Sequence, residues 1–132
     1  MTVPLKFAIL AFQGFPMMAF SAVIEPLRAA NTISSKKLYE WIIVGLDENP
    51  VVASNGIPIS PHFSARIAPL VDYIVVCSGG DADKISAESP LVWIRKNLRN
   101  GAHVGSDADG ARPLTESGIG YRFGGEAVSQ AG

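Results

Sequence analysis

Short apolar runs alternate with longer helical stretches along this sequence, and that alternation restricts the fold more than any other feature. The longest apolar runs are Leu5–Phe12, Tyr39–Leu46 and Asp72–Cys77, and Ala102–Gly105 is a shorter one. Each is almost continuously apolar, as in strands that are covered on both faces of a parallel sheet. Met17–Asn31 is rich in Ala and Met and predicts a helix. Strands alternating with helices predict a doubly wound parallel sheet.

Prolines and polar clusters set the expected helix boundaries. Pro26 lies inside the first helical stretch, so we expect a kink there or the start of a second helix. The polar stretch Asn31–Lys37 predicts a loop. Further on, Ser89 suits an N-cap and Pro90 the first helical position, which predicts a helix over Leu91–Arg99.

The middle of the chain predicts a β-hairpin. Asn55–Gly56 separates Val51–Ser54 from Ile57–Ser60, and Asn-Gly suits the two positive φ angles of a type I′ turn. Pro58 is expected to keep this arm off the main sheet or at its edge. The following Ser64–Leu70 is ambiguous and fits one helical turn.

Length and charge exclude several classes of protein. With 132 residues, 48% of them hydrophobic, the chain predicts one globular domain with a core of its own. Eleven basic and twelve acidic residues give a net charge of −1, which argues against nucleic-acid binding by this chain itself. We expect residues 1–123 to form the domain and the small, polar Gly124–Gly132 to be a flexible tail.

The cysteine and histidine content and the hydropathy exclude further classes of protein. Cys77 is the single cysteine, so an internal disulfide framework is excluded. His62 and His103 lie far apart, and no metal site or cofactor is expected. No apolar run reaches the roughly 20 residues of a membrane span. The N-terminus also lacks the pattern of a signal peptide. The sequence therefore predicts a soluble cytoplasmic protein.

Ligands of doubly wound sheets bind at the carboxyl ends of the strands. Those ends are here expected at Gln13–Pro16, Ser78–Asp81 and Gly105–Gly110. Backbone N–H groups of Gly79 and Gly80 could hold an anion or a carboxylate there. The alternative is a tight turn, since the loop has neither the GxGxxG nor the Walker A spacing.

The segment Gly105–Ala111 follows a strand, where a nucleophile elbow would stand. Its centre is Ala108 and not Ser or Cys, and Ser106 comes two residues early. Asp107 and Asp109 could contact a cationic ligand, although Asp109 also suits the cap of a helix that would open over 109–117.

A few other side chains could have either a functional or a structural role. Glu25 is the one acid in a long apolar stretch and could face a ligand, but it could equally pair with Arg28 on an exposed helix face. Cys77 ends a strand and is interpreted as a small buried hydrophobe. The remaining candidates are interpreted as core or as structural residues: Met17, Met18, Trp41, Trp93, His62 and His103. The basic side chains expected on a solvated helix face are Arg95, Lys96 and Arg99.

Several motifs together resemble one protein family. GFPMMAFSAVIEPLRAAN (Gly14–Asn31) resembles the start of the DJ-1/PfpI superfamily, and IEPLRAAN is its most specific part. More narrowly, it is similar to the amidotransferase-like N-terminal domain of GlxA-type regulators of the AraC family. The motifs that follow in the same order are Tyr39–Leu46, Ala53–Gly56, Val75–Gly80 and Asn100–Ala111. The resemblance runs from Leu5 to Ser117.

This resemblance implies a flavodoxin-like α/β fold of the class I glutamine amidotransferase type. Enzymes of the superfamily carry a nucleophilic Cys where this chain has Ala108, and an acid where it has Ala19, while Glu25 matches the Glu retained in EPLR. Without a thiol at position 108 there is no covalent catalysis of that type. The resemblance therefore implies a sensor without catalytic residues.

The expected function is ligand sensing by a regulatory domain, with a small nitrogen-containing metabolite such as an amino-acid derivative or a betaine as effector. The expected pocket comprises Phe15, Glu25, Gly79, Gly80, Ser106, Asp107, Ala108 and Asp109. The resemblance also implies a homodimer, and contact with DNA only through a helix-turn-helix domain that this chain lacks. Because the family's domain continues beyond this length, we expect a C-terminally truncated sheet. The alternatives are a DJ-1/PfpI-type enzyme (amidase, hydratase or glyoxalase-like) and a dimerisation module.

Overall fold

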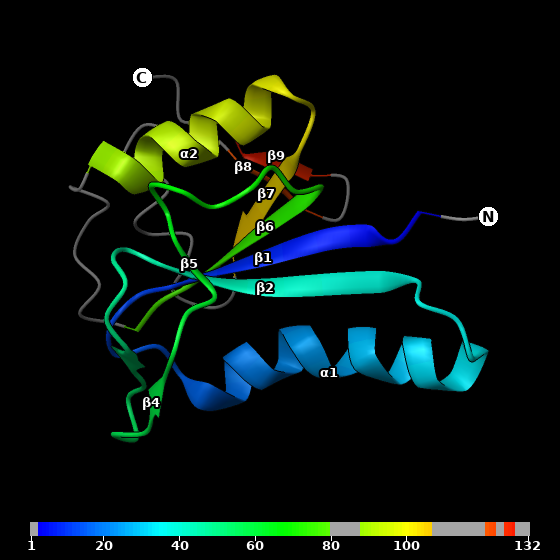
Figure 1. Cartoon of the computed structure of the whole chain (residues 1–132), viewed down its shortest axis with the longest axis horizontal. Coiled ribbons are helices and arrows are strands. Elements are labelled where there is room, and N and C mark those ends of the chain that lie inside the picture. The colour runs from blue at the N-terminus through cyan, green and yellow to red at the C-terminus, as the bar shows by residue number, and fades with distance from the viewer. Residues whose placement is uncertain (1–2, 80–87, 107–120, 124–125, 129–132) are drawn as a thin grey trace.

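Five parallel strands form the main sheet, in the order β5-β2-β1-β6-β7 (Figure 1). The computed structural model describes residues 3–79, 88–106, 121–123 and 126–128. The strands of this sheet are β1 (Leu5–Ala11), β2 (Tyr39–Gly45), β5 (Phe63–Ser64), β6 (Tyr73–Cys77) and β7 (His103–Ser106). The predicted parallel α/β sheet and its four longer strands are confirmed.

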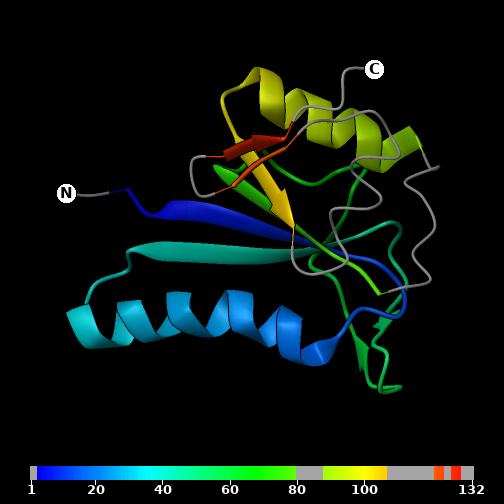
Figure 2. The same cartoon turned by 180° about the vertical axis from the view of Figure 1, so that it is seen from behind.

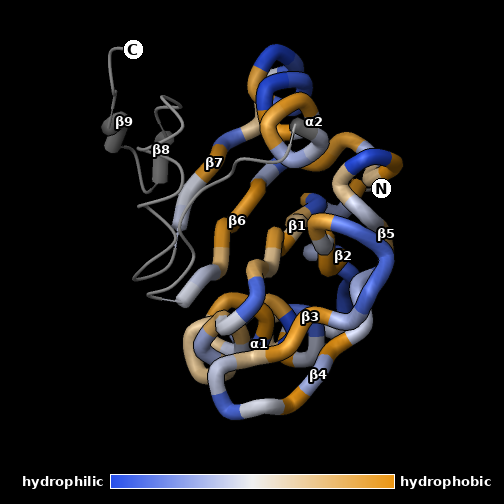
Figure 3. Tube along the Cα trace, turned by 90° about the vertical axis from the view of Figure 1, so that its left-hand side faces the viewer, coloured by the Kyte–Doolittle hydropathy of each residue, from blue (hydrophilic) through white to orange (hydrophobic). Residues whose placement is uncertain are grey.

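One helix covers each face of the sheet. Helix α1 (Met17–Ser34) lies on one side and α2 (Glu88–Arg99) on the other (Figures 2 and 3). Successive residues of β1 point to opposite faces. Leu10 therefore packs in the cluster that holds Trp93 of α2, whereas Ile9 packs in the cluster that holds Phe20 of α1. Burial on both faces explains why the strand sequences are apolar without a break.

Helix α1 is longer and simpler than its sequence predicts. It runs as one element to Ser34 with Pro26 inside, so neither a second helix nor a loop from residue 31 is observed. Pro26 has no N–H to donate to the Ala22 carbonyl four residues earlier. Both residues are exposed, so water can donate a hydrogen bond to that carbonyl instead. The helix ends at Ser35, whose backbone is left-handed with φ 57° and whose N–H donates to Thr32 O.

The hairpin forms, but with another turn. Strands β3 (Val51–Val52) and β4 (Pro58–Ile59) pair antiparallel in a sheet of their own, as Pro58 predicts. Gly56 has a positive φ of 85° and Asn55 does not, so the type I′ prediction is wrong. Ala53 donates to Ile57 O and Gly56 donates to Ala53 O, which is the three-residue loop with a glycine bulge.

Other boundaries also differ from the prediction. Part of the ambiguous Ser64–Leu70 belongs to β5, which pairs with β2, and a turn follows it. Ser89 is not the N-cap of α2, because the helix already begins at Glu88. Strands β8 (Tyr121–Phe123) and β9 (Glu126–Val128), which the sequence did not predict, pair antiparallel. The helix expected over 109–117 lies outside the described residues.

Most of the expected core is buried. Trp93 is 4% exposed and Cys77 is 0% exposed, and Trp41 packs at the margin of the α1-side cluster. Met18 is the exception, because it is 85% exposed on the outer side of α1. In the part of the chain that the structure describes, neither helix is long and apolar enough to cross a membrane.

Candidate functional site

The strand order places a topological switch point between β1 and β6. From β1 the chain crosses to β2 on one side, and the later strands β6 and β7 lie on the other side (Figure 1). In open α/β sheets the ligand crevice lies outside the carboxyl ends of the strands at such a point. The residues next to it are Phe12–Phe15 after β1 and Ser78–Gly79 after β6.

The two loops at the switch point are in direct contact. Phe12 N–H donates to Cys77 O at 3.0 Å. A Cβ on Gly79 would collide with the carbonyl oxygen of Gly14 and lie 3.0 Å from its carbonyl carbon. Only glycine fits at position 79 without moving the β1–α1 loop. This close approach explains Gly79 structurally, as the tight-turn alternative has it.

Two polar groups directly after β6 have no hydrogen-bond partner among the residues that the structure describes. Ser78 is 0% exposed, and its Oγ has no hydrogen-bond partner among the described residues. Nor does the Gly79 N–H donate to any other residue that the structure describes. A buried hydroxyl without a partner is uncommon in folded proteins, since desolvation costs about 1–3 kcal/mol. These groups lie at the switch point, where a ligand would be expected.

The hairpin fixes the β1–α1 loop from the other side. Gly14 N–H donates to Val52 O at 2.8 Å, and Val52 N–H donates to the Gln13 side-chain oxygen at 2.9 Å. Ser54 N–H donates to Phe15 O at 2.9 Å. The loop is therefore held by backbone groups of β3 and its turn, so this wall of the site is preformed.

Phe15 belongs to the core and does not line an open pocket. It is 0% exposed, and its ring lies 5.0 Å from the ring of Phe20 in the α1-side cluster. An aromatic side chain next to a strand end was expected to face a ligand. The ring is packed under α1 in this structure, and a contact between Phe15 and a ligand stays a prediction.

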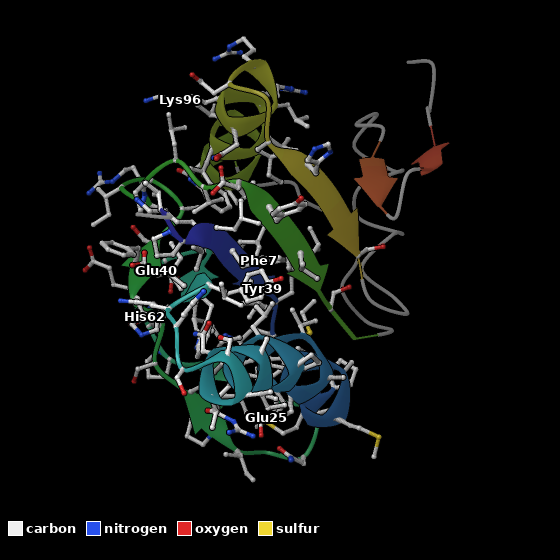
Figure 4. All side chains as sticks on the ribbon, turned by 90° about the vertical axis from the view of Figure 1, so that its right-hand side faces the viewer. Phe7, Glu25, Tyr39, Glu40, His62 and Lys96 are labelled. Carbon is white, nitrogen blue, oxygen red and sulfur yellow. The ribbon has the colours of Figure 1, made fainter. Side chains whose placement is uncertain are left out.

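Glu25 is not brought to the switch point either. Its carboxylate accepts a hydrogen bond from Arg28 Nε at 3.0 Å, and both side chains are more than half exposed. Figure 4 shows Glu25 on the side of α1 that faces away from the main sheet. At 1.5 Å per residue it lies roughly 12 Å along the helix from Met17. The hydrogen bond and the charge of Glu25 raise the pKa of the Arg28 guanidinium.

The third strand end carries Ser106, which is half-buried and pairs in register with Val76 of β6. No histidine lies beside it. His103 stacks on Tyr73 at 5.3 Å, in a row with Phe7 at the amino ends of the strands. His62 accepts the Ile43 N–H on Nδ1 at 2.9 Å, away from that row (Figure 4). These contacts hold each histidine against neighbouring strands, and the structural interpretation of both stays a prediction.

The structure therefore brings together only part of the predicted pocket. Gly79 follows β6 and Ser106 ends the neighbouring strand β7, whereas Phe15 is buried and Glu25 is remote. The predicted pocket residues outside the described part of the chain are Gly80, Asp107, Ala108 and Asp109. Sequence reasoning missed Ser78, whose only signal was a polar residue directly after a buried strand.

Metal ligands do not gather in this region. Within residues 3–79, 88–106, 121–123 and 126–128, no three His, Cys, Asp or Glu side chains are placed to share a metal ion.

Known proteins similar in sequence are transcriptional regulators. The chain is 29% identical over 116 residues to the HTH-type transcriptional regulator GbdR of Pseudomonas aeruginosa, which covers 88% of this chain and 32% of GbdR. It is 32% identical over 113 residues to the HTH-type transcriptional regulator CdhR of the same species, covering 86% of this chain and 33% of CdhR. No family model matches the sequence.

The homologues of this chain are HTH-type transcriptional regulators of the GlxA, GbdR and CdhR type. The chain spans about a third of their length. The resemblance to GlxA-type regulators is thereby confirmed.

Solved structures identify the fold. An AraC family transcriptional regulator from Pseudomonas putida superposes with a TM-score of 0.73 at 21% identity, over 87% of this chain and 62% of that one. A DJ-1 superfamily protein from Salmonella typhimurium superposes with a TM-score of 0.70 at 18% identity, over 86% and 61%. The chain therefore has the flavodoxin-like fold of DJ-1/PfpI domains, as predicted.

Proposed function

We propose that this chain is the non-catalytic, ligand-sensing domain of a cytoplasmic transcriptional regulator. Its effector is a small nitrogen-containing metabolite of the amino-acid or betaine class, bound at the β1–β6 switch point. The observation that carries the proposal is the buried Ser78 hydroxyl at the switch point, which has no partner in the described part of the chain, whose homologues are regulators.

The proposed contacts fall into two groups, one for the negative and one for the positive group of the effector. Backbone N–H groups of Gly79 and Gly80 bind the effector's carboxylate, as such groups do in anion-binding loops. Ser106, Asp107 and Asp109 face its cationic nitrogen, and Ala108 takes the place of a nucleophile. Glu25 and Phe15 are left out of this set, since one is remote from the strand ends and the other is buried in the core.

Binding would act on a second copy of the chain and on a DNA-binding domain outside this sequence. An effector that prefers one of two arrangements shifts the population toward it by its difference in affinity. Residues 1–123 would form the sensing unit, a homodimer would transmit the change, and contact with DNA would come from the other domain.

A thermal-shift screen tests this proposal. The probes are glycine betaine, carnitine, amino acids and polyamines, each compared with buffer. An effector at 100 times its Kd stabilises the native state by about 2.7 kcal/mol, which raises Tm by roughly 10 °C in a domain of this size. We expect a selective shift with one of the zwitterionic probes.

Variants test which residues the thermal shift depends on. Asp107→Ala should abolish it, while Glu40→Ala, which removes an acid at the amino end of β2 and so at the opposite edge of the sheet, should keep it. Glu25→Ala should keep it as well, because its carboxylate is engaged with Arg28 on the outer side of α1. A shift that survives Asp107→Ala, or no shift with any probe, would contradict the proposed site.

A further inference from the structure

A groove lies between α2 and the segment that connects β5 to β6, and it shares no lining residue with the loops at the switch point. Figures 1 and 2 both show this segment running alongside α2. The groove has a volume of about 260 Å³. Its lining residues come from both walls: Ala65, Arg66, Ala68, Ser89, Val92, Trp93 and Lys96. None of them belongs to the proposed effector site.

Hydrogen bonds hold the two walls of the groove together. The Trp93 indole N–H donates to Pro69 O at 3.1 Å. Val71 N–H donates to the Asn97 side-chain oxygen at 2.8 Å. Ala65 N–H donates to Gly45 O, which fixes the segment to β2. The groove is therefore preformed, so a ligand need not order it on binding.

The two charged side chains that line the groove, among the residues that the structure describes, are both basic. Arg66 stands on one wall and Lys96 on the other, and both side chains are exposed (Figure 4 labels Lys96). Among the described residues, the ion pairs involve only Arg28 with Glu25 and Lys37 with Glu40. Two cations that face one groove without a described carboxylate between them create a positive potential there.

Apart from Ser89, the rest of the lining is apolar. Ala65, Ala68 and Trp93 contribute methyl and ring surface, and Val92 is 54% exposed although it is a large aliphatic residue. A volume of about 260 Å³ lies below the range of roughly 300–1,000 Å³ that is typical of sites for drug-sized ligands. The groove thus fits a ligand with a single ring or a short branched chain.

We propose that this groove is a second small-molecule site, which binds an organic anion with a compact apolar body, such as an aromatic carboxylate. Arg66 and Lys96 bind the carboxylate by charge-assisted hydrogen bonds from opposite walls. Val92 and Ala68 contact the apolar body. The site does not depend on the proposed effector site, since it shares no residue with it.

Benzoate is a suitable probe, followed through the indole N–H resonances of the ¹⁵N-labelled protein. The chain has two tryptophans, and only Trp93 lines the groove, whereas Trp41 packs on the α1 side of the sheet. We expect benzoate to shift the Trp93 resonance saturably and to leave that of Trp41 in place. Benzylamine, which has a similar shape and the opposite charge, should leave both in place.

Two double variants of equal charge separate this site from general attraction. Arg66→Gln/Lys96→Gln should weaken benzoate binding at least tenfold. Arg95→Gln/Arg99→Gln removes two exposed charges from α2 outside the groove and should change the affinity less than twofold. An equal loss in both variants, a Trp93 shift with benzylamine, or no saturable shift with benzoate would overturn the proposal.

Discussion

One asparagine near the C-terminal end of each helix joins that helix to another segment through side-chain hydrogen bonds. The joined segment is near in the sequence for Asn31 of α1 and distant for Asn97 of α2. In α1, the Asn31 side-chain oxygen accepts the N–H groups of Leu38 and Tyr39 at 2.8 and 3.0 Å, and its amide donates to Tyr39 O. Asn31 therefore joins the end of the helix to the strand that follows it directly.

Asn97 in α2 instead reaches a remote segment. Its oxygen accepts the N–H of Val71, and its amide donates to Trp93 O within the same helix at 3.0 Å. Asn97 is 0% exposed, whereas Asn31 is half-buried. We infer from this difference that burial decides how much such a side chain stabilises the fold. If the side chain is removed, water can replace its hydrogen bonds at Asn31 but not at Asn97.

The largest expected effect belongs to Asn97→Ala. It leaves the Val71 N–H without its partner and opens a small cavity, so we expect a loss of about 2–4 kcal/mol in the free energy of unfolding. Urea unfolding measures it. Asn100→Ala is the matched control, since its exposed side-chain amide donates to Lys96 O within the same helix, and the loss should stay below about 0.5 kcal/mol. Equal losses in the two variants would contradict the role of burial.

Asn31→Ala should have a smaller effect, a loss of about 1–2 kcal/mol in the free energy of unfolding, because solvent can reach the Leu38 and Tyr39 N–H groups once the side chain is removed. Urea unfolding measures this loss as well.

Hydrogen exchange in the unchanged chain provides a second test of the contrast with Asn97. In the natural chain, the Val71 amide should exchange only with global unfolding, and the Leu38 amide should exchange faster through local opening at the end of α1. The opposite order would break the comparison.

Trp93→Phe tests whether Asn97 holds the remote segment alone. The change keeps most of the buried ring but removes the indole N–H, which leaves Pro69 O without its donor. We expect a loss of about 1 kcal/mol. In a double-mutant cycle with Asn97→Ala, the two losses should be less than additive, because both side chains fix the same segment against α2.

The smallest expected effect is that of Glu25→Gln on α1. The Glu25–Arg28 pair is exposed, and exposed pairs contribute little to stability. The pKa of Arg28 is raised above a value that is already far above neutral, so the guanidinium stays charged in the physiological range. We therefore expect an unchanged Tm between pH 5 and 9, measured by circular dichroism. A clear decrease would show that Glu25 has a partner other than Arg28.

Much of the fold was predictable, and the candidate site only in part. The four longer strands, both helices and the hairpin followed from apolar runs and turn residues. Gly79 was found because a strand precedes it, but its contact with Gly14 comes from two loops that are distant in the sequence. Glu25 was uncertain from the start, since an exposed ion pair and a ligand contact require the same residue types at the same spacing.

The sequence by itself determined the class of fold and the homology, because alternating apolar runs and the GFPMMAFSAVIEPLRAAN motif are properties of neighbouring residues. The tertiary structure decided which residues meet. It buried Phe15, turned Glu25 outward and left the Ser78 hydroxyl at the switch point without a partner among the described residues. It also placed Arg66 and Lys96 across one groove. Such encounters depend on strand order and helix position, which no local stretch of sequence specifies.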